Sequence, residues 1–272
     1  MRVAVTGAAG RVGMAVVDVL VARGHGVVAI DRSFSSVSQF GQAVMAREVD
    51  ASDFEALTLA LAGCDALVHL AAIPGPGRQP DSKVHNNNVT ASYNAMRAAV
   101  EVGIDRLCQA SSINAIGAAF SRVPHFDYLP VDTAHPTYNE DAYSLSKWIC
   151  EQQADSIARR YEGVSVKSLR FHLVAADESA ARAVTERNPP QAVRHLWGWT
   201  SFSAAAQACC LAVEIYRPGH SVYFVVSPRH VGPAPAEELL HTHYPDVPLR
   251  CPITGDDGFF DCSDGLQSLG WH

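Results

Sequence analysis

Cysteine patterns typical of disulfides or metal sites are missing from this chain. It has seven cysteines, an odd number, with no Cys-x-x-Cys and one adjacent pair, Cys209-Cys210. Neither a disulfide framework nor a zinc site is therefore predicted, and the cysteines are expected to be small buried hydrophobic residues. Among the twelve histidines the nearest pair is His241 and His243, which has no cysteine beside it. We expect no bound metal.

Long apolar runs and runs of positive charge are also missing. The chain enters a strand-like segment directly, without a signal-peptide pattern, and has no run of about 18 apolar residues. The net charge of −7 argues against a nucleic-acid partner. With 272 residues, 48% hydrophobic and 18% charged, we expect a globular cytoplasmic protein that binds neither membrane nor nucleic acid.

What the chain does contain is a glycine-rich turn between a strand and a helix. The apolar segment 3–5 is followed by Thr-Gly-Ala-Ala-Gly-Arg-Val-Gly over 6–13 and by a helix-like segment over 14–22. In such a turn the first glycine takes positive φ, the second lets a pyrophosphate approach, and the third lets the helix pack closely. The turn predicts a dinucleotide site. The expected contacts are Gly7, Ala9, Gly10, Arg11, Val12 and Gly13.

The second predicted strand, 27–30, ends at an acidic residue that favours NAD. Asp31 stands 18 residues after Gly13, where a carboxylate is expected to accept hydrogen bonds from the adenosine ribose. A carboxylate there repels a 2′-phosphate, so NAD is the expected cofactor. Arg32 follows directly. Because arginine would attract that phosphate, NADP stays possible, although Arg32 could equally be a solvated loop charge.

Strand-like and helix-like segments alternate over the first 170 residues. They are 44–49 then 53–62, 66–71 then 84–100, 106–110 then 141–161, and finally 165–169. Repeated units of this kind form parallel strands with right-handed crossovers, so the expected fold is α/β, a doubly wound parallel Rossmann-type sheet. Two irregular stretches, 73–83 and 118–141, follow the carboxyl ends of strands. We expect both to be walls of a ligand site.

The alternation decays beyond Arg170. The remaining predicted elements are a helix over 203–216, a strand over 221–226 and a helix over 234–243. Residues 1–170 are therefore expected to form an NAD(P)-binding domain that carries the catalytic residues. Residues 171–272 are expected to form a small substrate-binding cap that partly returns to the sheet.

The spacing of three residues predicts a catalytic site. Tyr143 and Lys147 are four residues apart on one helix face, and Ser112 is expected just past the strand 106–110. Lowering the pKa of a phenol from about 10 to about 7 requires about 4 kcal/mol. An ammonium about 4 Å away supplies roughly that at an effective dielectric constant of about 20. Tyr143 is predicted to be the acid/base, with Lys147 lowering its pKa and Ser112 holding the substrate oxygen.

Several motifs together resemble the extended short-chain dehydrogenases/reductases of the NAD-dependent epimerase/dehydratase family. Besides the turn at 6–13 they are Asp50-Ala51, His69-Leu70-Ala71-Ala72, Asn88-Val89-Thr90, Ser111 to Gly117, Tyr143 to Lys147, and Leu269-Gly270-Trp271. The resemblance implies catalytic roles for Ser112, Tyr143 and Lys147, and a homodimer formed through the central and Tyr143-bearing helices. It also implies cofactor contacts from Asp50, Ala51, Leu70, Ala71, Ala72, Asn88, Tyr143 and Lys147.

Departures from the family pattern narrow the expected activity. Ile113 and Asn114 stand where sugar-nucleotide dehydratases carry an Asp-Glu pair, so dehydration is not expected. After the sixth strand Leu173 replaces an asparagine usual in epimerases, and their Gly-Pro is missing. The chain thus resembles uronate dehydrogenase-like members. We expect an NAD(P)-dependent oxidoreductase that transfers a hydride to or from a small hydroxyl or carbonyl substrate, such as a sugar or sugar acid. A sugar epimerase and a non-catalytic cofactor sensor are the alternatives.

Contacts with this small-molecule substrate are expected near the catalytic residues and from the cap. The candidates are Ile73, Pro74, Ser112, Ile113, Asn114, His172 and Arg182. Arg182, like Arg187 and Arg194, lies in the expected cap, where one arginine could clamp a substrate carboxylate. The alternative is that these arginines lie on helix surfaces. Trp197 and Trp199 are expected either to stack on a sugar or to fill the core of the cap.

Overall fold

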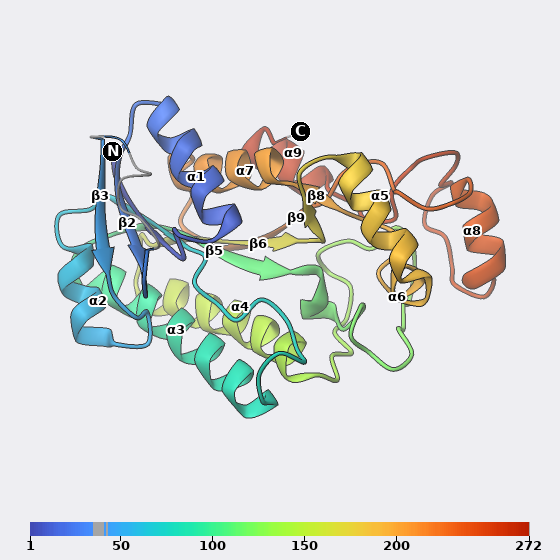
Figure 1. Ribbon diagram of the computed structural model, residues 1–272, viewed down its shortest axis with the longest axis horizontal. Helices are drawn as coiled ribbons and strands as arrows, with labels where there is room; N and C mark the ends of the chain where they lie inside the picture. The colour runs from blue at the N-terminus through green and yellow to red at the C-terminus, as the bar shows by residue number, and fades with distance from the viewer. Residues whose placement is uncertain (35–40, 42, 272) are drawn as a thin grey trace.

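A computed structural model describes residues 1–34, 41 and 43–271. Its centre is a seven-stranded parallel sheet in the order β3-β2-β1-β4-β5-β6-β9, with helices on both faces (Figure 1). The strands are β1 (Arg2–Thr6), β2 (Gly26–Asp31), β3 (Val44–Glu48), β4 (Ala66–His69), β5 (Arg106–Ser112), β6 (Ser165–Phe171) and β9 (Gly219–Val225). The predicted doubly wound parallel sheet is confirmed.

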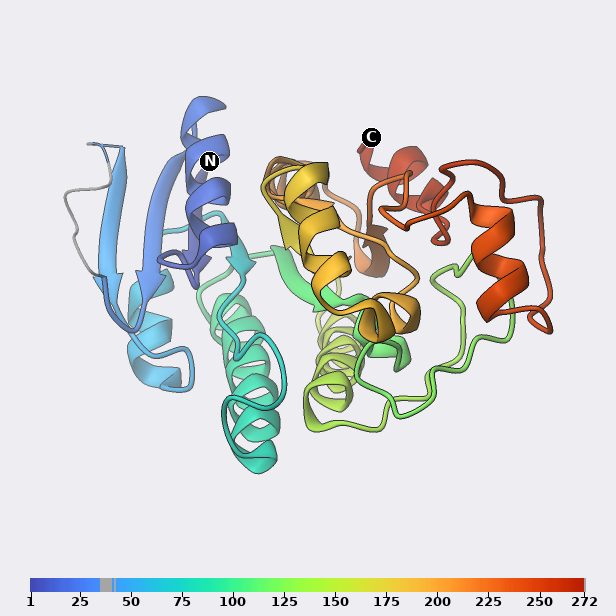
Figure 2. The same ribbon diagram turned by 45° about the vertical axis from the view of Figure 1, so that its right-hand side comes forward.

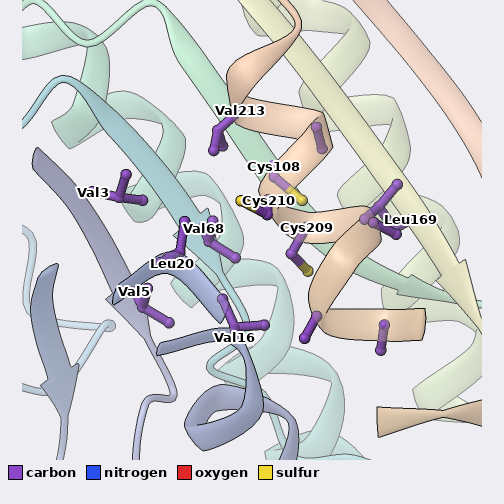
Figure 3. Packing of buried hydrophobic residues seen from close by; sticks show 14 of the residues in the cluster. Val3, Val5, Val16, Leu20, Val68, Cys108, Leu169, Cys209, Cys210 and Val213 are labelled. Atoms are coloured by element: carbon purple, nitrogen blue, oxygen red, sulfur yellow. The ribbon is translucent and has the colours of Figure 1, made fainter. Parts of the chain in front are cut away.

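The sheet is buried on both faces because helices cover each of them. Val3 and Val5 of β1 pack on one face with Val16 and Cys209 (Figure 3). Ala4, between them, packs on the other face. This alternation follows from the two-residue period of a strand. The first face is covered by α1 (Arg11–Ala22) and α7 (Phe202–Glu214), and the second by α2 (Phe54–Leu61), α3 (Asp81–Glu101) and α4 (Ala142–Arg160). No helix of the described chain is long and apolar enough to cross a membrane.

The cysteines are mostly, though not all, buried. Cys64, Cys108, Cys150, Cys209 and Cys210 are buried, which agrees with their expected role as small hydrophobic residues. Two others differ: Cys251 is exposed and Cys262 is partly exposed.

The chain beyond β6 contributes a strand to the sheet and forms further helices beside it. Strand β9 pairs in parallel with β6, and α7 packs against α1. The other elements are β7 (Val174–Ala175), α5 (Glu178–Arg187), α6 (Pro189–Arg194), β8 (Thr200–Ser201), α8 (Ala236–His243) and α9 (Ser263–Leu269). We call helices α5, α6 and α8 the cap. Figures 1 and 2 show α8 at the end of the molecule away from β2 and β3, with α5 and α6 between it and those strands. The division of the chain at residue 170 stays a prediction.

Sequence reasoning missed α5 and α6, although both carry start signals. The Asp177 carboxylate accepts a hydrogen bond from the Ala180 N–H at 2.8 Å, and Asn188 caps α6 with proline at the next position. The strand expected over 106–110 extends to Ser112, because the ladder with β6 continues to the pair of Ser112 with Phe171. Ser112 is therefore the last residue of β5.

A buried ion pair fixes α4 against the middle of the sheet. The Arg170 guanidinium on β6 donates to both oxygens of Glu151 on α4, at 2.9 and 2.8 Å. The Ser111 hydroxyl on β5 donates to the same carboxylate at 2.5 Å. Both charged side chains are less than 10% exposed and have little contact with water, so each one neutralises the charge of the other. The network ties α4 to the strand that ends at Ser112.

Removing one charge of this pair is expected to destabilise the chain strongly. In Arg170→Met the Glu151 carboxylate loses its counter-ion, so the free energy of unfolding should fall by about 3–5 kcal/mol in urea titrations. The double variant Glu151→Leu/Arg170→Met buries no unpaired charge and should lose less than the single variant. A double variant that is less stable than Arg170→Met would contradict this account.

Buried histidines are expected to make the fold sensitive to mild acid. Burial lowers the pKa of His69 from 6.5 to about 3 and that of His195 to about 4. Both stay neutral in the folded chain, while the unfolded chain takes up protons below pH 6.5. The free energy of unfolding should therefore fall as the pH drops from about 6.5 toward 4, by about 1.4 kcal/mol per pH unit for each histidine.

Urea titrations at pH 7.5 and 5.5 measure this loss. His69→Gln should lose about 1.4 kcal/mol less than the unmodified chain between these pH values. The exposed His241 gives a matched control, because His241→Gln should keep the full pH dependence. Equal stability of the unmodified chain at both pH values would disprove the effect.

Candidate active site

A pocket of about 750 Å³ opens at the carboxyl ends of the strands. It lies where the strand order reverses between β1 and β4, which is where ligands of such sheets bind. One end is lined by the turn after β1 and by the ends of β2 and β3. The other end is lined by the end of β5, the start of α4, and the cap helices α5 and α6.

The glycine turn has the shape that a pyrophosphate needs. Gly7 has a φ of +71°, and a Cβ there would lie 2.8 Å from the Ala71 nitrogen. A Cβ on Gly13 would lie 2.1 Å from the Gly7 carbonyl oxygen, so α1 packs on the turn as closely as predicted. Gly10 is the N-cap of helix α1 and supplies no side-chain cap. The first N–H groups of this helix are therefore left for a phosphate, and the turn fits a dinucleotide.

Asp31 is held in place at the end of β2. Its Oδ2 accepts a hydrogen bond from the Ala9 N–H at 2.9 Å, and its Oδ1 accepts from the Arg32 N–H at 2.8 Å. Asp31, Arg32 and Asp50 all line the pocket. Hydrogen bonds from Ser52 lower the pKa of Asp50, the backbone N–H contributing most. Two carboxylates thus face the space predicted for adenosine.

Most of the predicted cofactor contacts line the pocket, and two do not. Those in the lining are Gly7, Gly10, Arg11, Val12, Gly13, Asp31, Arg32, Asp50, Ala51, Leu70, Ala71, Ala72, Tyr143 and Lys147. Ala9 instead holds the Asp31 carboxylate. Asn88 is buried, and its Oδ1 accepts from the Ile73 N–H at 2.8 Å while its Nδ2 donates to the Ile73 carbonyl at 3.1 Å. Asn88 therefore clamps the loop that forms one pocket wall.

The predicted catalytic residues come together in the pocket. Tyr143 and Lys147 lie on the first turns of α4, which begins at Asp141, whose carboxylate accepts from the N–H groups of Tyr143 and Ser144 at 2.9 Å. Ser112, at the end of β5, lines the same pocket as Tyr143 and lowers the pKa of its phenol. The Lys147 ammonium lies 5.9 Å from the centre of the Tyr143 ring. Strand β5 and helix α4 thus assemble the trio.

Burial dominates the electrostatics of Tyr143. Desolvation raises its pKa from 10 to about 12, and the nearby Ser112 lowers it by less. The Lys147 ammonium donates to the Ala110 carbonyl at 2.8 Å, and burial lowers its own pKa. This differs from the predicted lowering of the phenol pKa by lysine, because desolvation raises that pKa and Ser112, rather than Lys147, is the group that lowers it.

Of the expected substrate contacts, Arg182 lies outside the pocket lining. One side of its guanidinium donates to the Gly232 carbonyl at 3.1 Å, and the other pairs with Glu178 at 3.0 Å. Arg194 likewise donates to the Ser121 carbonyl at 3.2 Å. Trp197 is buried in the core of the cap. Ile73, Pro74, Ser112, Ile113, Asn114 and His172 do line the pocket.

His172 lines the pocket with both ring nitrogens already occupied. Its Nε2 donates to the His195 carbonyl at 2.8 Å, and its Nδ1 accepts from the Leu173 N–H at 2.6 Å. Burial lowers its pKa well below 6.5, so the ring is neutral. His172 therefore presents a ring face to the pocket, and neither ring nitrogen is left for a hydrogen bond to substrate.

Sequence reasoning missed several pocket residues from the long loop and the cap. They are Phe120, Val184, Asn188, Gln191, His195 and Phe202. The Phe120 ring meets the Tyr143 ring edge to face, with centres 5.9 Å apart. Its loop, 118–141, was predicted to be a wall, but no local pattern indicates which residue points inward. Asn188, followed by proline, is a typical helix start and could have predicted α6 from the sequence.

Another side-chain cluster has the composition of a metal site and lies away from the pocket. Ligand atoms of His25, Cys210 and Glu214 lie within 4.8 Å of one another. Arg23 donates to both Glu214 oxygens, at 3.0 and 2.6 Å. Burial raises the pKa of Cys210 to about 12, which keeps its thiol protonated. With the carboxylate paired and the thiol neutral, the cluster is an ion-pair network that joins the ends of α1 and α7.

Comparison with known proteins agrees with this geometry. The model of the "NAD dependent epimerase/dehydratase family" matches residues 3–205. L-arabinose 1-dehydrogenase (NAD(P)(+)) of Haloferax volcanii is 34% identical over 203 residues, covering 72% of this chain and 76% of the relative. UDP-glucose 4-epimerase of Corynebacterium glutamicum is 32% identical over 182 residues, covering 64% of this chain and 52% of the relative.

Solved structures show the same fold. MoeE5 in complex with UDP-glucose and NAD superposes with a TM-score of 0.72 at 22% identity, covering 100% of this chain and 93% of that one. The sequence match, the glycine turn and the assembled Ser112, Tyr143 and Lys147 all agree. The chain belongs to the NAD-dependent epimerase/dehydratase family and is an NAD(P)-dependent enzyme of the extended short-chain dehydrogenase/reductase type.

Proposed function

We propose that this protein is an NAD-dependent oxidoreductase that acts on a hydroxyl or carbonyl group of a small sugar or sugar acid. The observation that carries the proposal is that Ser112, Tyr143 and Lys147 lie in one pocket with the glycine turn and Asp31. The similarity to an L-arabinose 1-dehydrogenase supports the substrate class. A sugar panel assayed for NADH formation tests it directly.

The residues of the pocket have separable tasks in this reaction. NAD, when bound, supplies a hydride acceptor and, in its oxidised form, a positive charge. Tyr143 Oη takes the proton of the substrate hydroxyl in oxidation and returns it in reduction. Ser112 donates a hydrogen bond to the substrate oxygen, and Lys147 Nζ, anchored on the Ala110 carbonyl, contributes a positive charge beside the phenol.

Burial of Tyr143 affects the two directions differently. With a pKa near 12 the phenol keeps its proton at neutral pH, so it is ready to act as the acid in carbonyl reduction. In oxidation it must lose that proton to act as a base. Oxidation should therefore speed up as the pH rises above 7, and the positive charge of the oxidised cofactor should favour the phenolate.

A sugar epimerase is the second candidate, favoured by the similarity to a UDP-glucose 4-epimerase. The two activities differ in their use of cofactor. A dehydrogenase accumulates NADH when its substrate is added, whereas an epimerase oxidises and re-reduces the sugar without net change. A sugar that is converted to its epimer with no change in NADH absorbance would favour the epimerase.

A homodimer formed through α3 and α4 belongs to the same proposal. These two helices pack side by side on one face of the sheet, and Tyr93 and Leu145 are exposed on them. Association would cover these side chains. Light scattering on the purified protein measures the mass. The cytoplasmic location also stays a prediction.

Asp31 is expected to decide between NAD and NADP. Asp31→Asn keeps an oxygen for the Ala9 N–H and removes the charge that faces the ribose. NAD affinity should fall about tenfold, since a hydrogen bond to a charged group is lost, while NADP affinity should hold or rise. Fluorescence titration with both cofactors measures this. Asp53→Asn, which alters the cap of α2 outside the pocket lining, is the control. Equal losses for both cofactors would refute the role of Asp31.

Tyr143 is expected to carry the proton transfer. Tyr143→Phe keeps the ring against Phe120 and removes the hydroxyl, so turnover should fall about 10²- to 10⁴-fold with NAD affinity unchanged. Lys147→Met should lower both turnover and NAD affinity. Tyr161→Phe, at the far end of α4, is a matched control. Turnover at the unmodified rate in Tyr143→Phe would leave the non-catalytic cofactor sensor as the better account.

A further inference from the structure

The orientation of the Asn114 amide is fixed by its neighbours. Asn114 stands in the short 3-10 helix Ile113–Ile116, two residues after Ser112. One end of its amide lies 2.9 Å from the Ala119 backbone nitrogen. Because a backbone N–H can only donate, the amide atom facing it must be the oxygen Oδ1. The amide nitrogen Nδ2 therefore faces Ser112, with its nitrogen 3.2 Å from Ser112 Oγ.

Asn114 fills both acceptor positions of the Ser112 hydroxyl. Besides the bond from Nδ2, Ser112 Oγ accepts the backbone N–H of Asn114 at 3.1 Å. A serine hydroxyl has two acceptor lone pairs and one proton. With both lone pairs used by one residue, the remaining capacity of Ser112 is to donate. Ser112 and Tyr143 line the same pocket, and the phenol of Tyr143 is near enough for Ser112 to lower its pKa.

We propose that Asn114 is a positioning residue that makes Ser112 an obligate hydrogen-bond donor to the reacting oxygen atoms. This inference rests on the proposed function, because it concerns the oxygen whose charge changes in that reaction. A donor stabilises negative charge on the phenolate or on the substrate oxygen, whereas a hydroxyl turned the other way would not. Ser112 keeps its own proton throughout, and Asn114 touches Ser112 rather than the substrate.

Because Ser112 and Asn114 are both buried, the direction in which the Ser112 hydroxyl donates its hydrogen bond matters. Ser112 is 6% and Asn114 7% exposed, so water competes little for their hydrogen bonds. In such a site a donor aimed at developing charge contributes more than it does in water. An unconstrained serine could rotate its proton toward a backbone carbonyl. The two bonds from Asn114 remove that freedom.

A variant of the same shape reverses the bond. Asn114→Asp keeps an oxygen for the Ala119 N–H but replaces the donor Nδ2 with an acceptor. Ser112 would then donate to the new carboxylate and turn away from Tyr143. Turnover should fall about 10- to 100-fold, and the rise of the oxidation rate with pH should move to higher pH. NAD affinity should stay unchanged.

The added charge could itself disfavour the phenolate, so the effect must be measured in two backgrounds. The charge acts with or without the serine hydroxyl, whereas the reversed bond requires it. In Ser112→Ala, the further change Asn114→Asp should cost less than about threefold in turnover if the proposal holds. An equal fall in both backgrounds would overturn it.

A second substitution avoids the charge and covers the case in which the aspartate variant does not fold. Asn114→Ala removes the Nδ2 donor and the contact to Ala119 together. If Asn114 only anchors the loop, the loss of turnover should be the same with Ser112 and with Ser112→Ala. If it directs the hydroxyl, the loss should be large only where Ser112 is present.

One measurement does not depend on the sugar reaction. The side-chain amide of Asn114, assigned in a ¹⁵N spectrum by its loss in Asn114→Asp, should shift in Ser112→Ala, because its acceptor is gone. It should stay unchanged in the control Ser52→Ala. An amide signal that ignores Ser112 would overturn the positioning role. A chain that turns over no sugar but shows this shift would disprove the proposed function and leave the arrangement standing.

Discussion

The site depends on the buried ion pair between Glu151 and Arg170. The proposed catalysis requires a strand residue and two helix residues, far apart in the sequence, to meet in one pocket. The ion pair fixes α4 against β6, and Ser111 adds β5 to the same carboxylate. Because the next residue is Ser112, the network sets where the serine hydroxyl stands relative to Tyr143. Its geometry cannot relax without exposing an unpaired charge.

The cofactor end of the pocket depends on close packing instead of charge. Gly13 brings α1 against the turn, and Gly7 brings the turn against the end of β4. The contacts leave no room for a side chain and direct the first N–H groups of α1 into the pocket. Asp31 is oriented by Ala9 of the same turn. One rigid turn thus positions both the expected pyrophosphate site and the expected ribose partner.

Tyr143 and Lys147, two of the predicted catalytic residues, are both buried but are affected differently by their neighbours. Desolvation raises the pKa of Tyr143, and the lysine charge that could oppose it is held by the Ala110 carbonyl. The cap adds apolar walls and neutral histidines, and two of its arginines, Arg182 and Arg194, bind carbonyls within the protein. In the proposed reaction, the hydrogen bonds from Asn114 to Ser112 would therefore orient the group that stabilises charge on the reacting oxygen.

The sequence by itself determined the parallel sheet, the glycine turn, the position of Asp31, and the shared face of Tyr143 and Lys147. Each follows from local rules, namely strand and helix periods, the space a glycine leaves, and the end of a strand. Only the tertiary structure decided which partners the side chains of Asn88, Asn114 and Arg182 have. It also decided that the Tyr143 phenol has a higher pKa than a free phenol. Side-chain direction and desolvation depend on neighbours from distant segments, and no local pattern encodes them.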